Sequence, residues 1–119
     1  MAGQILKTNF SLDDKYTLFE GRVILSGIQA LVRLLLDQHR ADLIKGFNTG
    51  TLVSGYRGSP VGTLDINLVK NKKILDEHNV KFIPGVNEDL GATLIYGSQM
   101  AGMVSNVKYD GVLGMWYGK

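Results

Sequence analysis

Apolar residues along the chain follow two patterns in turn, helical spacing and short continuous runs. A first set recurs at the spacing of one helix face and comprises Ile28, Leu31, Val32, Leu35 and Leu36. Ser26 lies directly before this set and is a residue type that caps helices, so the pattern predicts a helix over residues 27–39. The earlier residues 1–19 are mixed polar without a sustained period, and we expect an arm that packs against something else or stays mobile.

Strand patterns come after the first predicted helix. Residues 51–54 predict a short buried strand that ends at Gly55, and residues 80–83 predict another strand. The helix expected between them is more polar, and its apolar positions are Leu64, Leu68, Ile74 and Leu75. We expect that helix to end near His78 and Asn79.

A third helix and a last strand are predicted in the final third of the sequence. The apolar positions of this helix are Leu90, Leu94, Ile95 and Met103. Small residues leave one side of it thin, namely Gly91, Ala92, Gly97, Ala101 and Gly102. We therefore expect another segment to pack closely against it. Residues 112–116 predict a strand that no helix would cover before Lys119, so we expect an interrupted domain.

Alternation of predicted strands and helices favours the α/β class with a mostly parallel sheet flanked by helices. A parallel connection needs a crossover long enough to hold a helix, and each predicted helix here joins two strands or leads into one. We divide the 119 residues into an arm, 1–20, and the amino-terminal part of a domain, 21–119.

Composition narrows the classes of function. The net charge is only +2 and the basic residues are interspersed with carboxylates, so nucleic acid is not an expected partner. The absence of cysteine excludes disulfides, a cysteine nucleophile and thiolate-held iron–sulfur or zinc sites in these residues. No apolar run approaches the roughly 20 residues needed to cross a bilayer, so we expect no membrane association and a cytoplasmic location.

A glycine-rich bend, residues 55–62, lies where the first predicted strand meets the second predicted helix. Open parallel sheets bind ligands at such places, and glycines let the backbone approach a ligand closely. The bend has neither the Gly-Lys-Ser/Thr of a phosphate-binding loop nor a Gly-x-Gly-x-x-Gly pattern. On spacing alone, an ordinary tight connection is the commoner alternative.

Asn87, Glu88 and Asp89 open the third predicted helix. One interpretation is structural, because Asn87 can cap the helix and the two carboxylates complement its dipole. The functional interpretation has Glu88 pointing into a crevice, where its carboxyl group hydrogen-bonds a heteroaromatic nitrogen and shares or relays a proton. The local sequence does not choose between the two.

Two histidines and two aromatic residues receive no catalytic assignment. His39 and His78 fall near predicted helix ends, where an imidazole interacts favourably with terminal carbonyl groups. We expect no metal site, because no cysteine and no His-x-x-x-His pair accompanies them. Trp116 and Tyr117 are expected to be packing residues, since no basic stripe lies beside them.

Three segments, taken together, carry a resemblance to a known family. They are residues 54–60 (SGYRGSP), 84–90 (PGVNEDL) and 108–119 (KYDGVLGMWYGK). These segments resemble the amino-terminal region of the long indolepyruvate:ferredoxin oxidoreductases. The resemblance extends from roughly Tyr16 to Lys119, with the segments in the same order. Members of that family oxidatively decarboxylate arylpyruvates or related 2-oxoacids to acyl-coenzyme A with thiamine diphosphate, and pass electrons through iron–sulfur clusters to ferredoxin.

The resemblance implies that the chain is a fragment carrying part of a thiamine-diphosphate pyrimidine-binding domain. It implies that Glu88 is the catalytic glutamate, whose carboxyl group hydrogen-bonds a pyrimidine nitrogen and so assists proton removal from the thiazolium carbon. It also implies a bend beside the cofactor and the oxoacid. Gly58, Ser59 and Pro60 would line the cofactor, while Tyr56, Arg57 and Ser59 would contact the substrate. For Arg57, a hydrogen bond to loop carbonyl groups is an equal alternative.

Other parts of the family pattern are missing from this sequence. Asp110 and Gly111 lack the preceding glycine and downstream asparagine of a diphosphate-and-magnesium motif. Mg²⁺, iron–sulfur clusters and coenzyme A are therefore expected only in missing domains, and the isolated chain is expected to be inactive.

The partners that the resemblance implies follow from this. They are the remaining domains or chains of a dimeric oxidoreductase, ferredoxin and a small-molecule 2-oxoacid. The main alternative is a non-catalytic α/β interaction or dimerisation module in which Glu88 only starts a helix. A nucleotide-binding domain that uses residues 55–62 as a phosphate cradle is a third.

Overall fold

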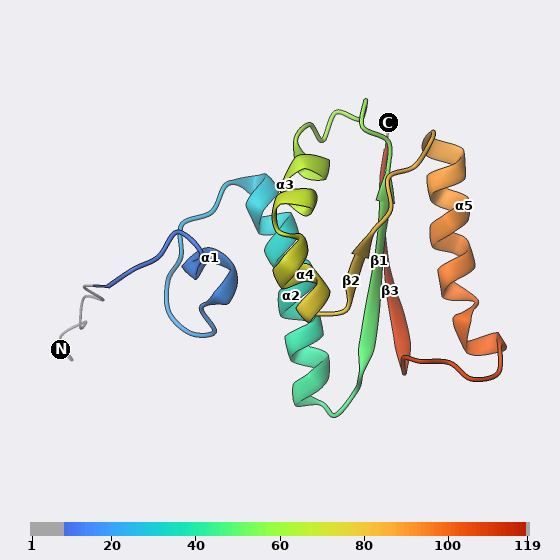
Figure 1. Ribbon diagram of the computed structural model, residues 1–119, viewed down its shortest axis with the longest axis horizontal. Helices are drawn as coiled ribbons and strands as arrows, with labels where there is room; N and C mark the ends of the chain where they lie inside the picture. The colour runs from blue at the N-terminus through green and yellow to red at the C-terminus, as the bar shows by residue number, and fades with distance from the viewer. Residues whose placement is uncertain (1–8, 119) are drawn as a thin grey trace.

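Three parallel strands form the sheet, in the order β2–β1–β3, and helices lie on both of its faces (Figure 1). The strands are β1 (Thr49–Gly55), β2 (Val80–Phe82) and β3 (Gly111–Tyr117). The structure is a computed structural model and describes residues 9–118. The predicted α/β class and parallel sheet are confirmed, and each strand lies at its predicted place in the sequence with somewhat shifted ends.

The first long helix, α2 (Gly27–Ile44), begins where the sequence predicts and ends later. Ser26 and Gln29 form a capping box: the Gln29 amide donates to Ser26 Oγ (3.2 Å), and the Ser26 amide donates to Gln29 Oε1 (2.9 Å). The predicted end at residue 39 is wrong. Residues 40–44 contain no helix breaker, and the helix continues until the chain turns at Gly46 with φ 85°.

The second predicted helix is in fact two short ones, α3 (Leu64–Lys70) and α4 (Lys72–Glu77). Asn71 separates them, with φ −99° and ψ 18°, and its side-chain Nδ2 donates to the Asn67 carbonyl (2.8 Å) that also accepts from its own amide (3.1 Å). Such local bonding by asparagine competes with regular helix geometry. The predicted end near His78 is confirmed, because Asn79 turns into the left-handed region with φ 56°.

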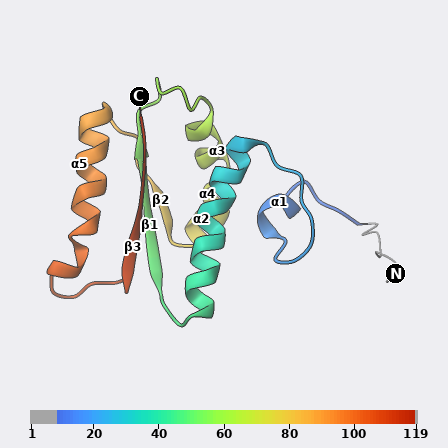
Figure 2. The same cartoon turned by 180° about the vertical axis from the view of Figure 1, so that it is seen from behind.

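On the opposite face lies a single helix, α5 (Glu88–Gln99), followed by the short 3₁₀ turn η1 (Ala101–Met103) (Figure 2). The continuous helix expected through Met103 therefore ends early. The predicted close packing is confirmed at Gly91, which is buried: a Cβ there would lie 3.3 Å from Ser54 Oγ and 3.5 Å from Trp116 Nε1. It is wrong at Gly97 and Gly102, where a Cβ would meet no atom within 4 Å. Gly91 thus lets the backbone of α5 approach β1 and β3.

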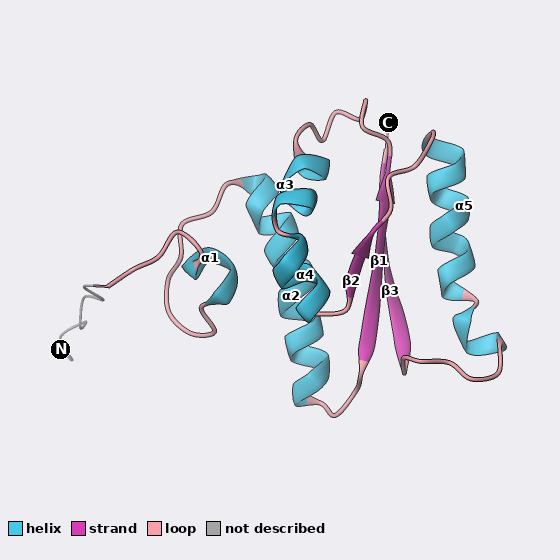
Figure 3. Ribbon diagram, in the orientation of Figure 1, coloured by secondary structure: helices cyan, strands magenta, loops and turns pink. Residues whose placement is uncertain are grey.

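Figure 3 shows α2, α3 and α4 together on one side of the sheet. The hydrophobic core lies almost entirely between these helices and the sheet. Its buried side chains are Tyr16, Val32, Leu35, Leu36, Val53, Leu64, Leu68, Leu75, Val80 and Tyr117. Of the helical pattern predicted for the first helix, three residues are completely buried and Ile28 and Leu31 pack against them. Burial of this apolar surface supplies the main stabilisation of the fold.

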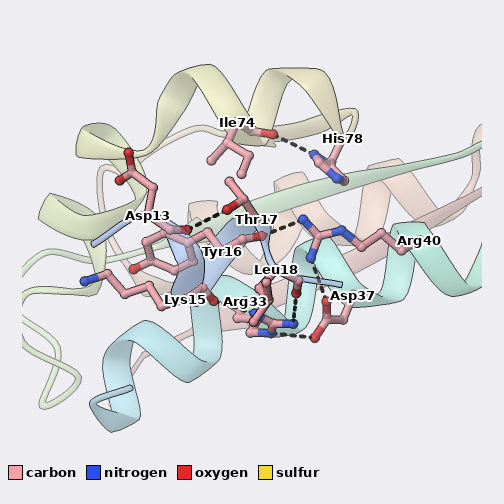
Figure 4. Close-up of polar contacts among 10 residues, drawn as sticks. All are labelled: Asp13, Lys15, Tyr16, Thr17, Leu18, Arg33, Asp37, Arg40, Ile74 and His78. Atoms are coloured by element: carbon pink, nitrogen blue, oxygen red, sulfur yellow. Dashed lines mark hydrogen bonds and ion pairs between the residues drawn. The ribbon is translucent and has the colours of Figure 1, made fainter. Parts of the chain in front are cut away.

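The described part of the arm, from residue 9, packs against α2 through the short helix α1 (Asp14–Thr17) (Figure 4). Arg33 donates to the carbonyl groups of Lys15 and Leu18, both at 2.7 Å, and Arg40 donates to the carbonyl group of Tyr16. Asp37 holds both guanidinium groups, at 2.9 and 2.8 Å. Of the two alternatives expected for the arm, this part therefore packs, and it packs against α2. Residues 1–8 lie outside the described residues.

Within residues 9–118, none of the helices combines the length and the apolar character that a membrane span requires.

Candidate functional site

The carboxyl ends of the three strands meet at one edge of the sheet, which we call the carboxyl edge. The bend after β1, the residue after β3 and the start of α5 all lie at this end of the molecule (Figure 1). α3 and α4 connect β1 to β2 on one face, and α5 connects β2 to β3 across the other. In open parallel sheets, ligands bind where the strand order reverses in this way, which here is between β1 and β3.

The bend after β1 is held by Ser59, whose side chain is buried. The Ser59 amide donates to the Tyr56 carbonyl (3.0 Å), and Ser59 Oγ accepts from the Val61 amide (3.2 Å). A Cβ at Gly58 would lie 2.7 Å from Cε1 of the Tyr56 ring, so a side chain there would displace this exposed ring. Pro60 is exposed. The bend is thus an ordered turn with one buried hydroxyl, and both interpretations of it from the sequence remain compatible with this geometry.

Arg57 projects from the bend toward α3. Its Nε lies 3.3 Å from Oδ2 of Asp65, and the side chains of Arg57 and Asp65 are 65% and 17% exposed. The structure therefore places Arg57 in an ion pair, an arrangement that the sequence did not suggest. An ion pair with one exposed partner contributes little to stability, but it orients the guanidinium group near the carboxyl edge.

Glu88 is the first residue of α5 and is partly buried. The structural interpretation of this segment is confirmed, because Asn87 Oδ1 accepts from the Leu90 amide (2.8 Å) as a helix cap. The indole Nε1 of Trp116 donates to the Glu88 carbonyl (3.1 Å), which ties the first turn of α5 to β3. Just before the helix, the Gly85 amide donates to the Gly55 carbonyl (2.9 Å).

These contacts bring two predicted site segments to the same edge. Gly55 is the last residue of β1 and leads directly into the bend, so its bond to Gly85 joins the bend to the segment that begins α5. Capping and a functional role for Glu88 are compatible, since the cap uses Asn87 and the indole bond uses the Glu88 main chain. The role of the Glu88 carboxyl group stays a prediction.

Tyr117 is a packing residue, as the sequence predicts, but its position beside the candidate site was not predicted. Its ring is buried, stacks on Phe82 with centroids 6.5 Å apart, and leaves no room for a Cβ at Gly55, which would lie 2.5 Å from its Cδ1. Its hydroxyl oxygen is buried and has no hydrogen-bond partner among the described residues. Burial raises the pKa of Tyr117, as does the carboxylate of Asp65, while Arg57 opposes them.

The sequence contains one signal for this position, because neighbouring residues of a strand point to opposite faces of the sheet. In the structure the half-exposed Trp116 lies beside α5, so Tyr117 faces the side of α3. What the sequence does not contain is the proximity of Tyr117 to Asp65, which belongs to a helix far away in the chain. The hydroxyl group is thus a buried polar atom close to the Arg57–Asp65 pair and open to a further hydrogen bond.

Neither a metal cluster within the described part of the chain nor a match to a known protein marks this site. Among the described residues, no group of three or more histidine, aspartate and glutamate side chains could hold a metal ion. No family model matches the chain, and comparisons with curated proteins and with solved structures find no match. The fold and the carboxyl edge therefore define an α/β domain with a candidate ligand site, and its function rests on the residues themselves.

Proposed function

We propose that this chain supplies the aminopyrimidine side of a thiamine-diphosphate site in a 2-oxoacid:ferredoxin oxidoreductase of the indolepyruvate type. The observation that carries the proposal is the position of Glu88, at the start of α5 on the carboxyl edge, next to the end of β1 and the bend that follows it. The family resemblance implies a glutamate at the start of this helix, and Glu88 is the first residue of α5.

In this proposal the residues at this edge would bind the pyrimidine half of the cofactor. The Glu88 carboxyl group would hydrogen-bond a ring nitrogen and exchange a proton with it. Gly58 would present its main chain to the ring once the side chain of Tyr56, which lies over this glycine, turned aside. When bound, thiamine diphosphate supplies the carbon nucleophile for decarboxylation. The described residues contain no cluster for Mg²⁺, so the diphosphate half would be held by other domains or chains.

The bend would contribute to substrate binding. The exposed Arg57 would attract the carboxylate of the 2-oxoacid, and its pair with Asp65 would set the direction of the guanidinium group. The half-exposed Tyr56 would flank the same substrate. Ser59 would have a different part: its oxygen accepts from the Val61 amide, while its hydroxyl hydrogen can still be donated to a bound oxygen atom.

Glu88→Gln in the complete oxidoreductase tests the proposal against a matched control, Asp89→Asn. Both carboxylates belong to the first turn of α5 and complement its dipole, but only Glu88 is assigned to the ring nitrogen. We expect Glu88→Gln to lower the rate of 2-oxoacid-dependent ferredoxin reduction by about 10²–10⁴-fold, the usual contribution of a general acid–base group. Asp89→Asn should leave the rate within about twofold, because helix-dipole effects at exposed sites are small.

Equal effects of the two substitutions on stability, with turnover and thiamine-diphosphate binding unchanged, would show that Glu88 only starts a helix.

A second candidate function has its own supporting observation. Apolar side chains on and beside α5 and β3 are exposed, among them Leu90, Leu94, Leu113 and Trp116. An interaction or dimerisation module would use this surface. Sedimentation of the chain at several concentrations distinguishes the two: the module predicts reversible self-association that Leu90→Glu abolishes, with no loss of oxidoreductase activity in the complete protein.

A further inference from the structure

A buried histidine lies at the edge of the sheet opposite the candidate site, which we call the amino edge. His39 of α2 is 4% exposed, and its ring lies edge-on to that of His78, which follows α4, with centroids 5.5 Å apart. The prediction that His39 lies near a helix end is wrong, because α2 continues for five residues beyond it. A histidine inside the fold at this position has no part in the proposed chemistry.

The amide group of Asn79 determines which nitrogen of His39 carries a proton. Asn79 Nδ2 lies 3.2 Å from the Thr49 carbonyl oxygen, 3.2 Å from Asn48 Oδ1 and 3.2 Å from His39 Nε2. A main-chain carbonyl can only accept, so the Asn79 atom at this point is the donating nitrogen. The two hydrogens of this nitrogen face three acceptors, so the bond to His39 Nε2 is shared with the two oxygens. An Nε2–H group would point at a donating nitrogen, so the neutral ring is favoured with its proton on Nδ1, which is buried without a partner among the described residues.

The same reasoning assigns a proton to one nitrogen of His78. Its Nδ1 lies 2.9 Å from the Ile74 carbonyl, a bond drawn in Figure 4, and therefore donates. The imidazole of His78 is thereby fixed against His39. A favourable interaction of this imidazole with a carbonyl group near the helix end is what the sequence led us to expect.

These bonds join segments that are distant in the chain. Through Asn79, His39 on α2 is linked to the turn at Asn48 and to the start of β1 at Thr49. The main chain of Asn79 continues the link, because its carbonyl accepts from the Thr51 amide (2.9 Å) where β1 and β2 begin to pair.

We propose that His39 is an acid-sensitive latch of the amino edge: a proton added at its Nε2 abolishes the contact with Asn79 and loosens the start of β1 and β2. The cationic ring would point an N–H group at an amide nitrogen that also donates, and two donors repel each other. The proton would in addition place a charge in a site where no carboxylate from residues 9–118 is bonded to the imidazole.

The charged groups around His39 act in the same direction, with one exception. Burial lowers the pKa of His39 below 6.5, and His78 and Arg40 lower it further, whereas Asp42 raises it. The carboxylate of Asp42 is itself engaged, since it accepts from Thr49 Oγ1 (2.7 Å) and from Gln38 Nε2 (2.9 Å). It therefore compensates only in part for the proton on His39.

The sign of the effect follows from this direction. Below pH 6.5 the unfolded or opened chain binds a proton at residue 39 more readily than the closed state does, so the closed state loses stability as the pH falls. The loss begins near pH 6.5 and is complete below the lowered pKa of the closed state. A single proton changes the opening constant by at most about tenfold for each pH unit.

Hydrogen exchange of the chain between pH 7.5 and 5 tests the latch, with an internal control at the other edge. Protection factors of the Thr51 amide should fall below pH 6.5, by at most about tenfold per pH unit, while that of the Ile83 amide, bonded to the Val53 carbonyl, should fall much less. Nitrogen NMR of the imidazole rings should show His39 protonated on Nδ1 at pH 7.5 and gaining its second proton below pH 6.5.

Two variants complete the test. His39→Gln keeps an acceptor for Asn79 and does not titrate, so the difference in pH dependence between Thr51 and Ile83 should vanish. His78→Gln removes a group that lowers the pKa of His39, so His39 should take up its proton at higher pH than in the unsubstituted chain. Protonation of His39 at or above pH 6.5, or equal pH dependence of the two amides in the unsubstituted chain, would overturn the proposal even if His39→Gln fails to fold.

Discussion

The two faces of the sheet are built in different ways. α2, α3 and α4 bury large apolar side chains against one face, and α2 alone contributes Val32, Leu35 and Leu36 without residual exposure. α5 covers the other face, and Gly91 is the only residue of that helix that is buried. On the first face, large buried side chains pack against the sheet. On the second face, the main chain of α5 lies close to the strands at Gly91.

This difference assigns separate tasks to the two faces. Stability comes mainly from the packed face, because the free energy of burial scales with the apolar area removed from water. The α5 face positions Glu88 through specific contacts, the cap by Asn87 and the indole bond from Trp116. A helix that buries little can be placed accurately by such contacts while leaving its own apolar residues, such as Leu90, on the surface.

Truncation of a leucine on each face should separate them most clearly. Leu35→Ala removes a side chain with 0% exposure and should lower the free energy of unfolding by about 2–5 kcal/mol through lost burial and a cavity. Leu94→Ala on α5, where the side chain is 37% exposed, should cost less than about 1 kcal/mol. Chemical denaturation followed by circular dichroism measures both, and equal losses would contradict the comparison.

Side-chain volume added to α5 gives the next largest effect. Gly91→Leu inserts atoms where even a Cβ would lie 3.3 Å from Ser54 Oγ, and should cost about 1–3 kcal/mol by overpacking. Gly97→Leu makes the same change in the same helix at a position with open space, and should stabilise by up to about 1 kcal/mol through helix propensity. A loss of similar size at both positions in thermal unfolding would mean that Gly91 has no special contact.

The smallest effect expected is that of the indole hydrogen bond. Trp116→Phe keeps an aromatic ring but removes the donor to the Glu88 carbonyl, at a cost of about 1 kcal/mol. Water can replace the lost donor, because the side chain of Trp116 is 42% exposed. Amide exchange should therefore accelerate in the first turn of α5, at Leu90 and Gly91, with little change in β1 and β2. Unchanged exchange there would show that the bond does not hold this turn.

Much of the local structure at the candidate site could be predicted because these residues lie at element boundaries. Glycines and proline predicted the bend, and Asn87 predicted the start of α5. Turns and helix caps depend on residues that are close together in the sequence. The sequence did not predict features that have no local pattern. Asn71 interrupts a helix through its own side-chain bond, and Tyr117 and Asp65 are brought close only by the sheet.

By itself, the sequence determined the class of fold, the position of each strand and the starts of α2 and α5, because hydrophobic period, caps and breakers act over a few residues. The strand order, the burial of His39 beside Asn79 and the grouping of Arg57, Asp65 and Tyr117 were decided by the tertiary structure. The physical reason is that burial and hydrogen-bond partners depend on segments far apart in the chain, whose packing no local pattern encodes.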